Sequence, residues 1–541
     1  MNITELQQSY ASHPNVEGVC RLLKDNSVRH LYCGGLYASA ASLFSSVLVQ
    51  RATCPLVFIL GDMEEAGYFY HDLTQILGTE QVLFFPSSFR RAIKYGQKDA
   101  ANEILRTEVL SRLQKGEEGL CVVTYPDALA EKVVSRKELG DNTLKLHAGE
   151  RVDMNFVTDV LRSYGFEYVD YVYEPGQYAV RGSIIDVFSF SSEYPFRIDF
   201  FGDEVESVRT FEVETQLSKE KKESIVIVPD LSHSLEKKGS GGMVSFLDFL
   251  PSDSLLAMRD FLWLRERIQT VHDESLTPQA IAARESEENG AITLEGKLID
   301  GGEFTLRALD FRRMEFGNKP TGTPDATVSF HTTVQPIFHK NFDMVAESFR
   351  EYLSRHYTIY ICSDSLKQTD RIRAIFEDRG DNISFTAVER TLHEGFADDT
   401  LRICVFTDHQ LFDRFHKYNL KSDKARSGKV ALSLKELNQF TPGDYVVHTD
   451  HGVGRFAGLV RIPNGDTTQE VMKIVYQNED VVFVSIHSLH KVSKYKGKEG
   501  EAPRLNKLGT GAWEKLKDRT KTKIKDIALS LIHISEPTRR S

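Results

Sequence analysis

The sequence predicts a multidomain α/β protein whose carboxyl-terminal part holds a small β-barrel followed by a helix. Strand-like and helix-like segments alternate over residues 1–142, and the alternation restarts over residues 326–430. Such alternation is typical of open, largely parallel sheets that are covered by helices. Residues 438–500 differ, because roughly four or five short strands follow one another across tight turns, which predicts an SH3-like barrel.

The composition indicates a globular protein of several domains in a reducing compartment. Its 541 residues suffice for about three to five domains. The net charge of −11 argues against nonspecific binding of nucleic acid by the whole surface. The six cysteines form no Cys-x-x-Cys pair, so neither a disulfide framework nor a zinc site is expected. The amino terminus is polar and no apolar run reaches about 18 residues, so we expect a cytoplasmic protein without a membrane span.

The first α/β segment contains a turn that resembles a degenerate phosphate-binding loop. Strands are expected at residues 30–33, 55–60, 81–85 and 119–124, with helices at 39–50, 64–77 and 99–115. A P-loop reads Gly-x-x-x-x-Gly-Lys-Ser/Thr. Counted from Gly34, the chain has Ser39, Ala40 and Ala41 where Gly, Lys and Ser/Thr belong. ATP hydrolysis is therefore not expected, although the helix amino terminus could still attract an anion weakly.

The second segment, residues 143–228, predicts an α+β domain. A helix is expected at residues 154–164, followed by strands at 169–172, 178–180, 183–188 and 196–201. Arg181, Arg197 and Phe201 fall on or beside these strands. The resemblance given below, and not the strand pattern, singles these three out; arginines offer forked donors to carboxylates and an aromatic ring offers area to bury, which is compatible with the interface that it implies. The alternative is that both arginines pair with acidic residues on the same sheet face.

Residues 229–430 carry a weaker pattern. A helix is expected at 280–288, and a hairpin with strands at 292–298 and 303–308 around Gly301 and Gly302. Helices are then expected at 342–356 and 365–379, and strands at 358–362, 383–387 and 402–407. Asp364 and Asp408 follow strands of this last group, where open sheets often bind ligands. Capping of the next helix is the preferred interpretation of both carboxylates.

The barrel segment predicts a partner-binding module rather than an enzyme. Gly458 is expected at a bulge, and strands at residues 471–476 and 481–486 flank a second polar turn. His448 and His451 make a poor metal pair on a strand, because side chains an odd number of residues apart face opposite sides. We expect no metal site and no catalytic residue. An exposed sheet edge here could instead add a strand to a partner's sheet.

The barrel segment resembles the RNA-polymerase-interacting domain shared by CarD-type regulators and bacterial transcription-repair coupling factors. Residues 446–458 read Val-Val-His-Thr-Asp-His-Gly-Val-Gly-Arg-Phe-Ala-Gly, which is a long and specific pattern. The similarity continues through residues 505–513, which resemble the exit of a coupling factor into its linker helix. In that family an edge strand meets the polymerase β subunit. The residues that this resemblance implies for the contact are Leu459, Val460, Arg461, Ile462 and Pro463; the alternative is that Ile462 belongs to the core.

A second resemblance concerns residues 173–188 and 197–206, which are similar to the domain of the excision-repair subunit UvrB that docks UvrA. It implies a UvrA contact at Arg181, Arg197 and Phe201. The organisation implied by both resemblances is a UvrB-like α/β domain with a degenerate P-loop (1–142), an inserted UvrA-binding-like α+β domain (143–228), a return to the UvrB-like module with a small subdomain (229–325), a second α/β domain (326–430), the barrel (438–500), a basic linker helix (505–528) and a non-native or truncated tail (529–541).

The resemblance covers the amino-terminal half of a transcription-repair coupling factor. It implies an adaptor that binds stalled RNA polymerase through its β subunit and recruits UvrA for nucleotide excision repair. The family's ATP- and Mg-dependent motor, which translocates on double-stranded DNA, is missing from this sequence. We therefore expect no cofactor, no membrane contact and no hydrolysis by this chain. The alternatives are a CarD-like transcription regulator without a repair role and a UvrB- or helicase-like ATPase.

Overall fold

The computed structural model describes the chain except at residues 90–98, 214, 232–241, 286–293, 295, 415, 417, 419, 421–440, 449, 465–466, 486–491, 496–502, 509–512 and 514–541. The expected linker helix and the tail therefore lie almost entirely outside the described residues. Among the helices of the described part, none is long and apolar enough to cross a membrane.

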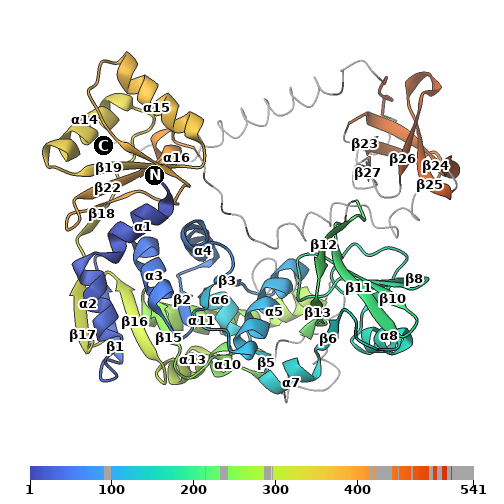
Figure 1. Cartoon of the computed structure of the whole chain (residues 1–541), viewed down its shortest axis with the longest axis horizontal. Coiled ribbons are helices and arrows are strands. Elements are labelled where there is room, and N and C mark those ends of the chain that lie inside the picture. The colour runs from blue at the N-terminus through green and yellow to red at the C-terminus, as the bar shows by residue number, and fades with distance from the viewer. Residues whose placement is uncertain are drawn as a thin grey trace.

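A seven-stranded parallel sheet forms the centre of the molecule (Figure 1). Its strands, in spatial order, are β17 (Ala326–Ser329), β1 (His30–Gly34), β16 (Arg312–Gly317), β15 (Leu255–Met258), β2 (Leu56–Ile59), β4 (Cys121–Thr124) and β3 (Val82–Phe85). The four apolar strands predicted in residues 1–142 are confirmed to within about two residues as β1, β2, β3 and β4. Strands buried on both faces read as continuous apolar runs, which explains why they were visible in the sequence.

Helices cover both faces of this sheet. They are α1 (Ile3–Ala11), α2 (Pro14–Leu22), α3 (Ala40–Arg51), α4 (Met63–Leu77), α5 (Ala100–Lys115), α6 (Pro126–Ala130), α7 (Arg136–Asp141), α10 (Phe246–Phe249), α11 (Phe261–Ser275), α12 (Pro278–Glu285) and α13 (Gly301–Ala308). A small ribbon, β5 (Val133–Val134) with β14 (Met243–Val244), lies beside them. Strands β15, β16 and β17 return to the first sheet from residues 255–329, so the chain between β4 and β15 is an insertion.

The hairpin expected around Gly301 and Gly302 is wrong, because residues 301–308 form helix α13. Asp300 caps this helix by accepting a hydrogen bond from the Glu303 backbone N–H at 2.7 Å. Gly301 is needed for close helix packing rather than for a turn. A Cβ atom there would lie 2.7 Å from the carbonyl oxygen of Arg265 on α11. A side chain would therefore push the two helices apart.

The inserted domain contains a six-stranded sheet with the order β12-β11-β10-β9-β8-β7. Its strands are β7 (Glu167–Tyr168), β8 (Gln177–Arg181), β9 (Ile184–Val187), β10 (Phe196–Phe201), β11 (Glu204–Phe211) and β12 (Ser218–Lys222). Helix α8 (Met154–Ser163) and the pair β6 (Leu144–His147) with β13 (Ser224–Ile227) cover one face. The prediction of a strand at residues 169–172 is wrong, because β7 ends at Tyr168 and the following residues form no strand. Val172 is buried by packing near Ile104 of α5, and not by strand pairing.

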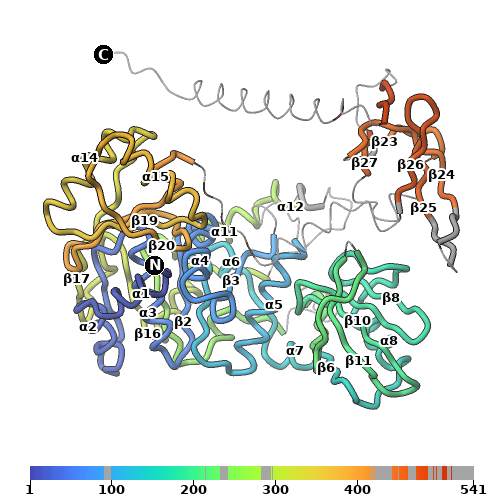
Figure 2. The backbone as a smooth tube through the Cα atoms, turned by 45° about the horizontal axis from the view of Figure 1, so that its top comes forward, coloured from blue at the N-terminus to red at the C-terminus, as the bar shows by residue number. Residues whose placement is uncertain are grey.

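A third sheet has the order β18-β21-β22-β19-β20 and carries helices α14 (Phe342–Ser354), α15 (Leu366–Asp378) and α16 (Asp408–Leu411). Its strands are β18 (Thr332–Val334), β19 (Thr358–Ser363), β20 (Thr386–Glu389), β21 (Phe396–Asp398) and β22 (Ile403–Thr407). The first residues of the chain lie against this sheet (Figure 2), where Asn2 bridges Glu389. Phe396 and Val405 belong to the same hydrophobic cluster as the seven-stranded sheet, so the two α/β parts share a core.

The barrel segment forms a five-stranded antiparallel sheet with the order β26-β25-β24-β23-β27. Its elements are β23 (Tyr445–His448), β24 (Gly452–Asn464), β25 (Thr467–Val475), the 3₁₀ turn η4 (Gln477–Glu479), β26 (Val481–Ser485) and β27 (Val492–Lys494). Five strands and the second polar turn are confirmed. The bulge at Gly458 is also confirmed, because the β24–β25 register shifts between Phe456 and Leu459 and Gly458 has φ = 105°.

Candidate functional site

The degenerate P-loop turn is held by another part of the same chain. Gly34 ends β1, and Ala40 and Ala41 are buried in the first turn of α3. The Ser39 hydroxyl donates to Asp72 Oδ2 at 2.6 Å and accepts from the backbone N–H of Glu394 at 3.0 Å. Segment 392–395, which leads from β20 to β21, therefore lies against the amino terminus of α3.

Two backbone donors of this turn are also engaged by residues that lie far away in the sequence. In a P-loop such N–H groups cradle phosphate. Here the N–H of Tyr37 donates to Thr332 Oγ1 at 3.0 Å, and that of Ser39 donates to the Glu394 carbonyl oxygen at 3.3 Å. Asp72 accepts from the His393 N–H at 2.7 Å, and burial raises the pKa of its carboxyl to about 6. A phosphate placed at this turn would meet an acidic group and occupied donors.

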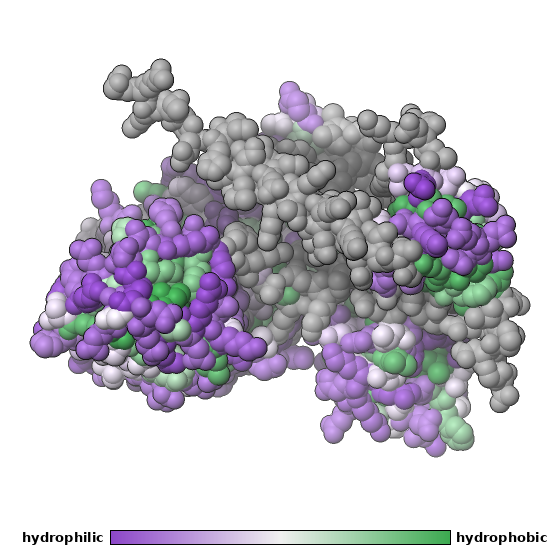
Figure 3. All heavy atoms as spheres, turned by 90° about the horizontal axis from the view of Figure 1, so that it is seen from above, coloured by the Kyte–Doolittle hydropathy of each residue, from purple (hydrophilic) through white to green (hydrophobic). Residues whose placement is uncertain are grey.

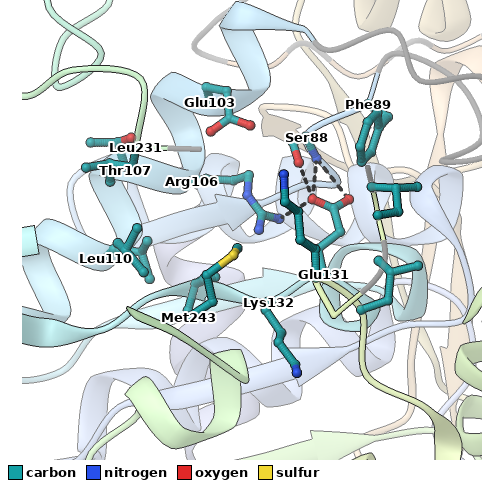
Figure 4. Close-up of a pocket in the computed structure, with 15 residues that line it drawn as sticks. Ser88, Phe89, Glu103, Arg106, Thr107, Leu110, Glu131, Lys132, Leu231 and Met243 are labelled. Atoms are coloured by element: carbon teal, nitrogen blue, oxygen red, sulfur yellow. Dashed lines mark hydrogen bonds and ion pairs between the residues drawn. The ribbon is translucent and has the colours of Figure 1, made fainter. Parts of the chain in front are cut away.

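A small cavity of about 60 Å³ lies where β3 ends, between α5 and β5 (Figure 4). Ser88 and Arg106 converge there on the buried carboxylate of Glu131. Arg106 Nη1 lies 3.4 Å from Glu131 Oε2, and the Ser87 hydroxyl donates to Glu131 Oε1 at 2.5 Å. The space would hold about two water molecules. It is too small for a nucleotide, and its paired charges suit a structural role.

The two arginines expected at the UvrA contact share one buried carboxylate. Arg197 on β10 donates from Nε to Asp186 Oδ1 at 2.7 Å and from Nη2 to Asp186 Oδ2 at 2.9 Å. Arg181 on β8 forms an ion pair with the same Asp186 Oδ2. Asp186 lies on the intervening strand β9 and is fully buried. The pairing with a local acidic residue, left open as an alternative, is thus present in the structure.

Phe201 is the most exposed of the three residues. It ends β10, its exposed fraction is 80%, and alternation along the strand places it on the same face as Arg197. Neighbouring Phe200 is buried on the opposite face, against the cluster that α8 covers. Sequence reasoning missed Asp186, although a single carboxylate within the apolar run of β9 was a usable signal. The structure therefore groups Arg181, Arg197 and Phe201 on one face, around an aspartate that orients both arginines.

The residues expected at the polymerase contact lie on β24, and part of that strand is an edge. Leu459 to Asn464 pair with β25 on one side. On the other side β23 pairs only as far as Arg455, and Asp444 pairs with Phe456. Beyond Phe456 no other strand of the described part pairs with this side. Leu459 is 39% exposed and Val460 is half-buried, and the backbone of Arg461, Ile462 and Pro463 continues the same strand.

The segment after the barrel packs onto its glycine-rich core. The Asn506 side chain accepts from the Val453 N–H at 2.8 Å, and the Asn506 N–H donates to the Val453 carbonyl at 2.9 Å. A Cβ atom on Gly452 would lie 2.7 Å from the Asn506 side chain and 2.9 Å from Trp513. Gly452 therefore serves close packing as well as the turn, and residues near 506 belong to the barrel.

Asp364 and Asp408 do not cap helices, so that prediction is wrong. Asp364 Oδ1 accepts from the Thr391 N–H at 3.1 Å, and Asp408 Oδ2 accepts from Arg414 at 2.8 Å. Both carboxylates line one polar cavity of about 260 Å³ at the carboxyl ends of β19 and β22, together with His409. The strand-end position of both residues is confirmed, and each carboxylate there accepts a hydrogen bond from a group of the chain itself.

The argument against a metal at His448 and His451 assumed that both residues lie on one strand, and this assumption is wrong. His451 lies beyond the end of β23, and the two rings stack with centroids 4.6 Å apart instead of facing opposite sides. His448 Nδ1 accepts from the Asp450 N–H at 3.1 Å, which removes that nitrogen as a ligand. In the described part of the chain no group of three or more His, Cys, Asp or Glu is arranged to hold a metal ion.

The six cysteines are all free. Cys33, Cys121, Cys362 and Cys404 are buried, and burial raises the pKa of each of these thiols. A raised thiol pKa makes these side chains poor nucleophiles. They act as small apolar core residues.

Comparison with known proteins defines the class of this chain. Residues 144–233 match the family model of the UvrB interaction domain. Residues 440–496 match that of the CarD-like/TRCF RID domain. One polypeptide therefore carries a segment similar to the UvrB interaction domain and a segment similar to the CarD-like/TRCF RID domain.

Curated relatives point to the particular family. The chain is 23% identical over 578 residues to a transcription-repair-coupling factor of Bacillus subtilis (strain 168). It is 24% identical over 564 residues to the transcription-repair-coupling factor of Staphylococcus aureus (strain bovine RF122 / ET3-1). Each alignment covers 92% of this chain and 48% of the relative, so the chain spans about half the length of these relatives. It resembles the amino-terminal half of a transcription-repair coupling factor.

Proposed function

We propose that this chain is the adaptor half of a transcription-repair coupling factor. Its barrel binds RNA polymerase, through the β subunit, and its inserted domain recruits UvrA for nucleotide excision repair. The observation that carries the proposal is the presence of both matched modules on one chain. The alternative of a CarD-like regulator without a repair role leaves the UvrB interaction domain unexplained.

The proposed polymerase contact is strand addition at the side of β24 that, beyond Phe456, pairs with no strand among the described residues. An unpaired row of backbone N–H and C=O groups is a template for a partner strand. Leu459 adds an exposed apolar side chain next to that row, and hydrophobic residues reach the surface of the molecule at several places among hydrophilic ones (Figure 3). The partner would be a sheet edge of the polymerase β subunit, and contacts would run over Leu459, Val460, Arg461, Ile462 and Pro463.

We further propose that the chain neither hydrolyses ATP nor needs a cofactor. The positions of the P-loop lysine and hydroxyl are held by Ala40 and Ala41, and segment 392–395 lies against the turn. In the parent, ATP, Mg and double-stranded DNA would belong to the motor. This interpretation disfavours the UvrB- or helicase-like ATPase alternative.

The polymerase part is tested by co-elution of the chain with purified RNA polymerase on size exclusion. Ile462→Arg introduces a charge on β24, in the part of the strand that lies beyond Phe456. The matched control is Val481→Arg, which introduces a charge on β26, the edge strand on the other side of β25. Loss of co-elution in the first variant alone supports the proposed contact. Loss of co-elution in Val481→Arg alone would contradict the proposed contact and would indicate that polymerase binds at β26 instead. Far-ultraviolet circular dichroism of both variants verifies that they fold.

A further inference from the structure

The polar face of the six-stranded sheet carries a third arginine that neither the sequence pattern nor the comparisons single out. Arg209 on β11 is the direct cross-strand neighbour of Arg197. It forms an ion pair with Asp199 on β10, as Arg181 does with Asp186. The face thus holds three arginines and two aspartates within four adjacent strands, while the opposite face is covered by α8.

The three arginines differ in what they can still offer a partner. Arg197 is nearly saturated, because it donates twice to Asp186 and once to the Gln216 carbonyl oxygen at 3.1 Å. Its side chain lies over the Phe211 ring at 4.5 Å and is only 14% exposed. The hydrogen bond to Asp186 raises the pKa of the Arg197 guanidinium, so this group stays protonated. Its three hydrogen bonds hold Arg197 in place within the domain.

Arg181 and Arg209 are more open. Their side chains are 34% and 37% exposed, and each makes a single ion pair in the described part of the chain. Arg181 also lies over the Tyr171 ring at 5.0 Å, which orients it along the surface. The backbones of β8 and β11 are three strand spacings apart, about 14 Å. Two such guanidinium groups can meet two separate carboxylates of one partner.

We propose that Arg209 is a further contact residue of the surface that binds UvrA, and that Arg197 is a positioning residue held by Asp186. The proposal rests on the function proposed above. The partner would present two acidic side chains, one to Arg181 and one to Arg209, and an apolar pocket to Phe201. Asp186 and Asp199 keep the arginines extended, so that little side-chain freedom is lost on binding.

The test is the affinity of the full chain for purified UvrA at several salt concentrations. A contact charge contributes to the salt dependence of binding, whereas a positioning residue does not. We expect Arg181→Gln and Arg209→Gln each to weaken binding about tenfold and to reduce its dependence on salt. Arg197→Gln should weaken binding with the salt dependence unchanged. Arg162→Gln is the matched control, because Arg162 forms an exposed ion pair with Asp159 on α8, over the opposite face.

A conservative pair of variants separates contact from positioning. Arg209→Lys should keep most of the affinity, because a point charge still attracts a carboxylate. Arg197→Lys should lose most of the affinity, because lysine cannot form the bidentate pair of hydrogen bonds that Arg197 makes with Asp186. Thermal unfolding of each variant verifies that the domain folds.

The outcomes distinguish this inference from the function on which it rests. If Arg209→Gln binds like Arg162→Gln while Arg181→Gln is weakened, the assignment of Arg209 is overturned and the proposed UvrA contact stands. If Arg197→Gln reduces the salt dependence as Arg181→Gln does, its positioning role is overturned. If the unmodified chain does not bind UvrA at all, the proposed function itself fails, and this inference fails with it.

Discussion

Acid should weaken the junction between the two α/β parts, because neutral histidines are packed there. His393 stacks on Tyr68 with ring centroids 3.6 Å apart, and His416 lies 5.0 Å from His71 and 4.4 Å from His409. His71 Nε2 and His393 Nδ1 are buried without a hydrogen-bond partner in the described part. Burial lowers the pKa of both His71 and His393 from 6.5 to about 4.

The sign and size of the effect follow from these values. The unfolded chain binds protons at these imidazoles near pH 6.5 and the folded chain only near pH 4, so stability is lost as the pH falls between the two. From pH 7.5 to pH 5 the free energy of unfolding should fall by about 2 kcal/mol for each imidazole. Asp72 opposes this, because its raised pKa of about 6 lets the folded state take up a proton first. Its contribution over the same interval is a gain of about 1 kcal/mol.

The assay compares urea unfolding of the chain with that of the double variant His71→Phe/His393→Phe at pH 7.5 and pH 5. Phenylalanine keeps a flat ring at each contact and removes the titration. We expect acid to destabilise the unmodified chain and to destabilise the double variant less, because His409 and His416, whose pKa burial also lowers, remain in it. His147→Gln, at an exposed histidine, is the control and should behave like the unmodified chain. An equal loss of stability in the double variant would refute the assignment to His71 and His393.

Three further predictions concern packing and chemistry. Gly67→Ala should destabilise the chain, because the new Cβ would lie 2.3 Å from the Tyr418 ring. Gly18→Ala should stabilise α2 by up to about 1 kcal/mol, because a Cβ there would meet nothing within 4 Å. Thermal unfolding of the two variants measures both effects. Asn506→Ala should cost the barrel about 1–2 kcal/mol, because the buried Val453 N–H loses its acceptor, and the fluorescence of Trp513 during unfolding measures this in a Trp263→Phe background. The purified chain should release no phosphate from ATP, with or without DNA, in a coupled phosphate assay; turnover that survives repurification would contradict the account of the occupied turn.

Regular elements were predictable where one local pattern decided them. The parallel strands β2 and β4 are continuous apolar runs, and the hairpin β25–β26 is bounded by a polar turn. Helix α13 was missed because two glycines suggest a turn, while the reason for Gly301 is the neighbouring helix α11. Strand β7 was misplaced because Val172 owes its burial to α5, which lies far away in sequence. Long-range packing of this kind leaves no periodic signal in the segment itself.

In the candidate sites, too, local patterns were predictable and contacts between distant segments were not. The resemblance singled out Arg181, Arg197 and Phe201, and the alternative allowed for an acidic partner of the arginines, but neither identified Asp186 as the carboxylate that binds both. The contact of segment 392–395 with Ser39 joins residues more than 350 positions apart, and no spacing rule links them. The stacking of His448 on His451 depends on where β23 ends, and element ends are the least reliable feature of sequence reasoning.

The most direct test of the adaptor proposal is whether one chain bridges both partners. RNA polymerase, purified UvrA and the chain are mixed at equimolar concentration and separated by size exclusion, with each pair as a reference. The proposal predicts a single complex that contains all three proteins, that loses only polymerase with Ile462→Arg and that retains less UvrA, with polymerase still bound, with Arg181→Gln. Two separate binary complexes, or a chain that binds neither partner while folded, would contradict it.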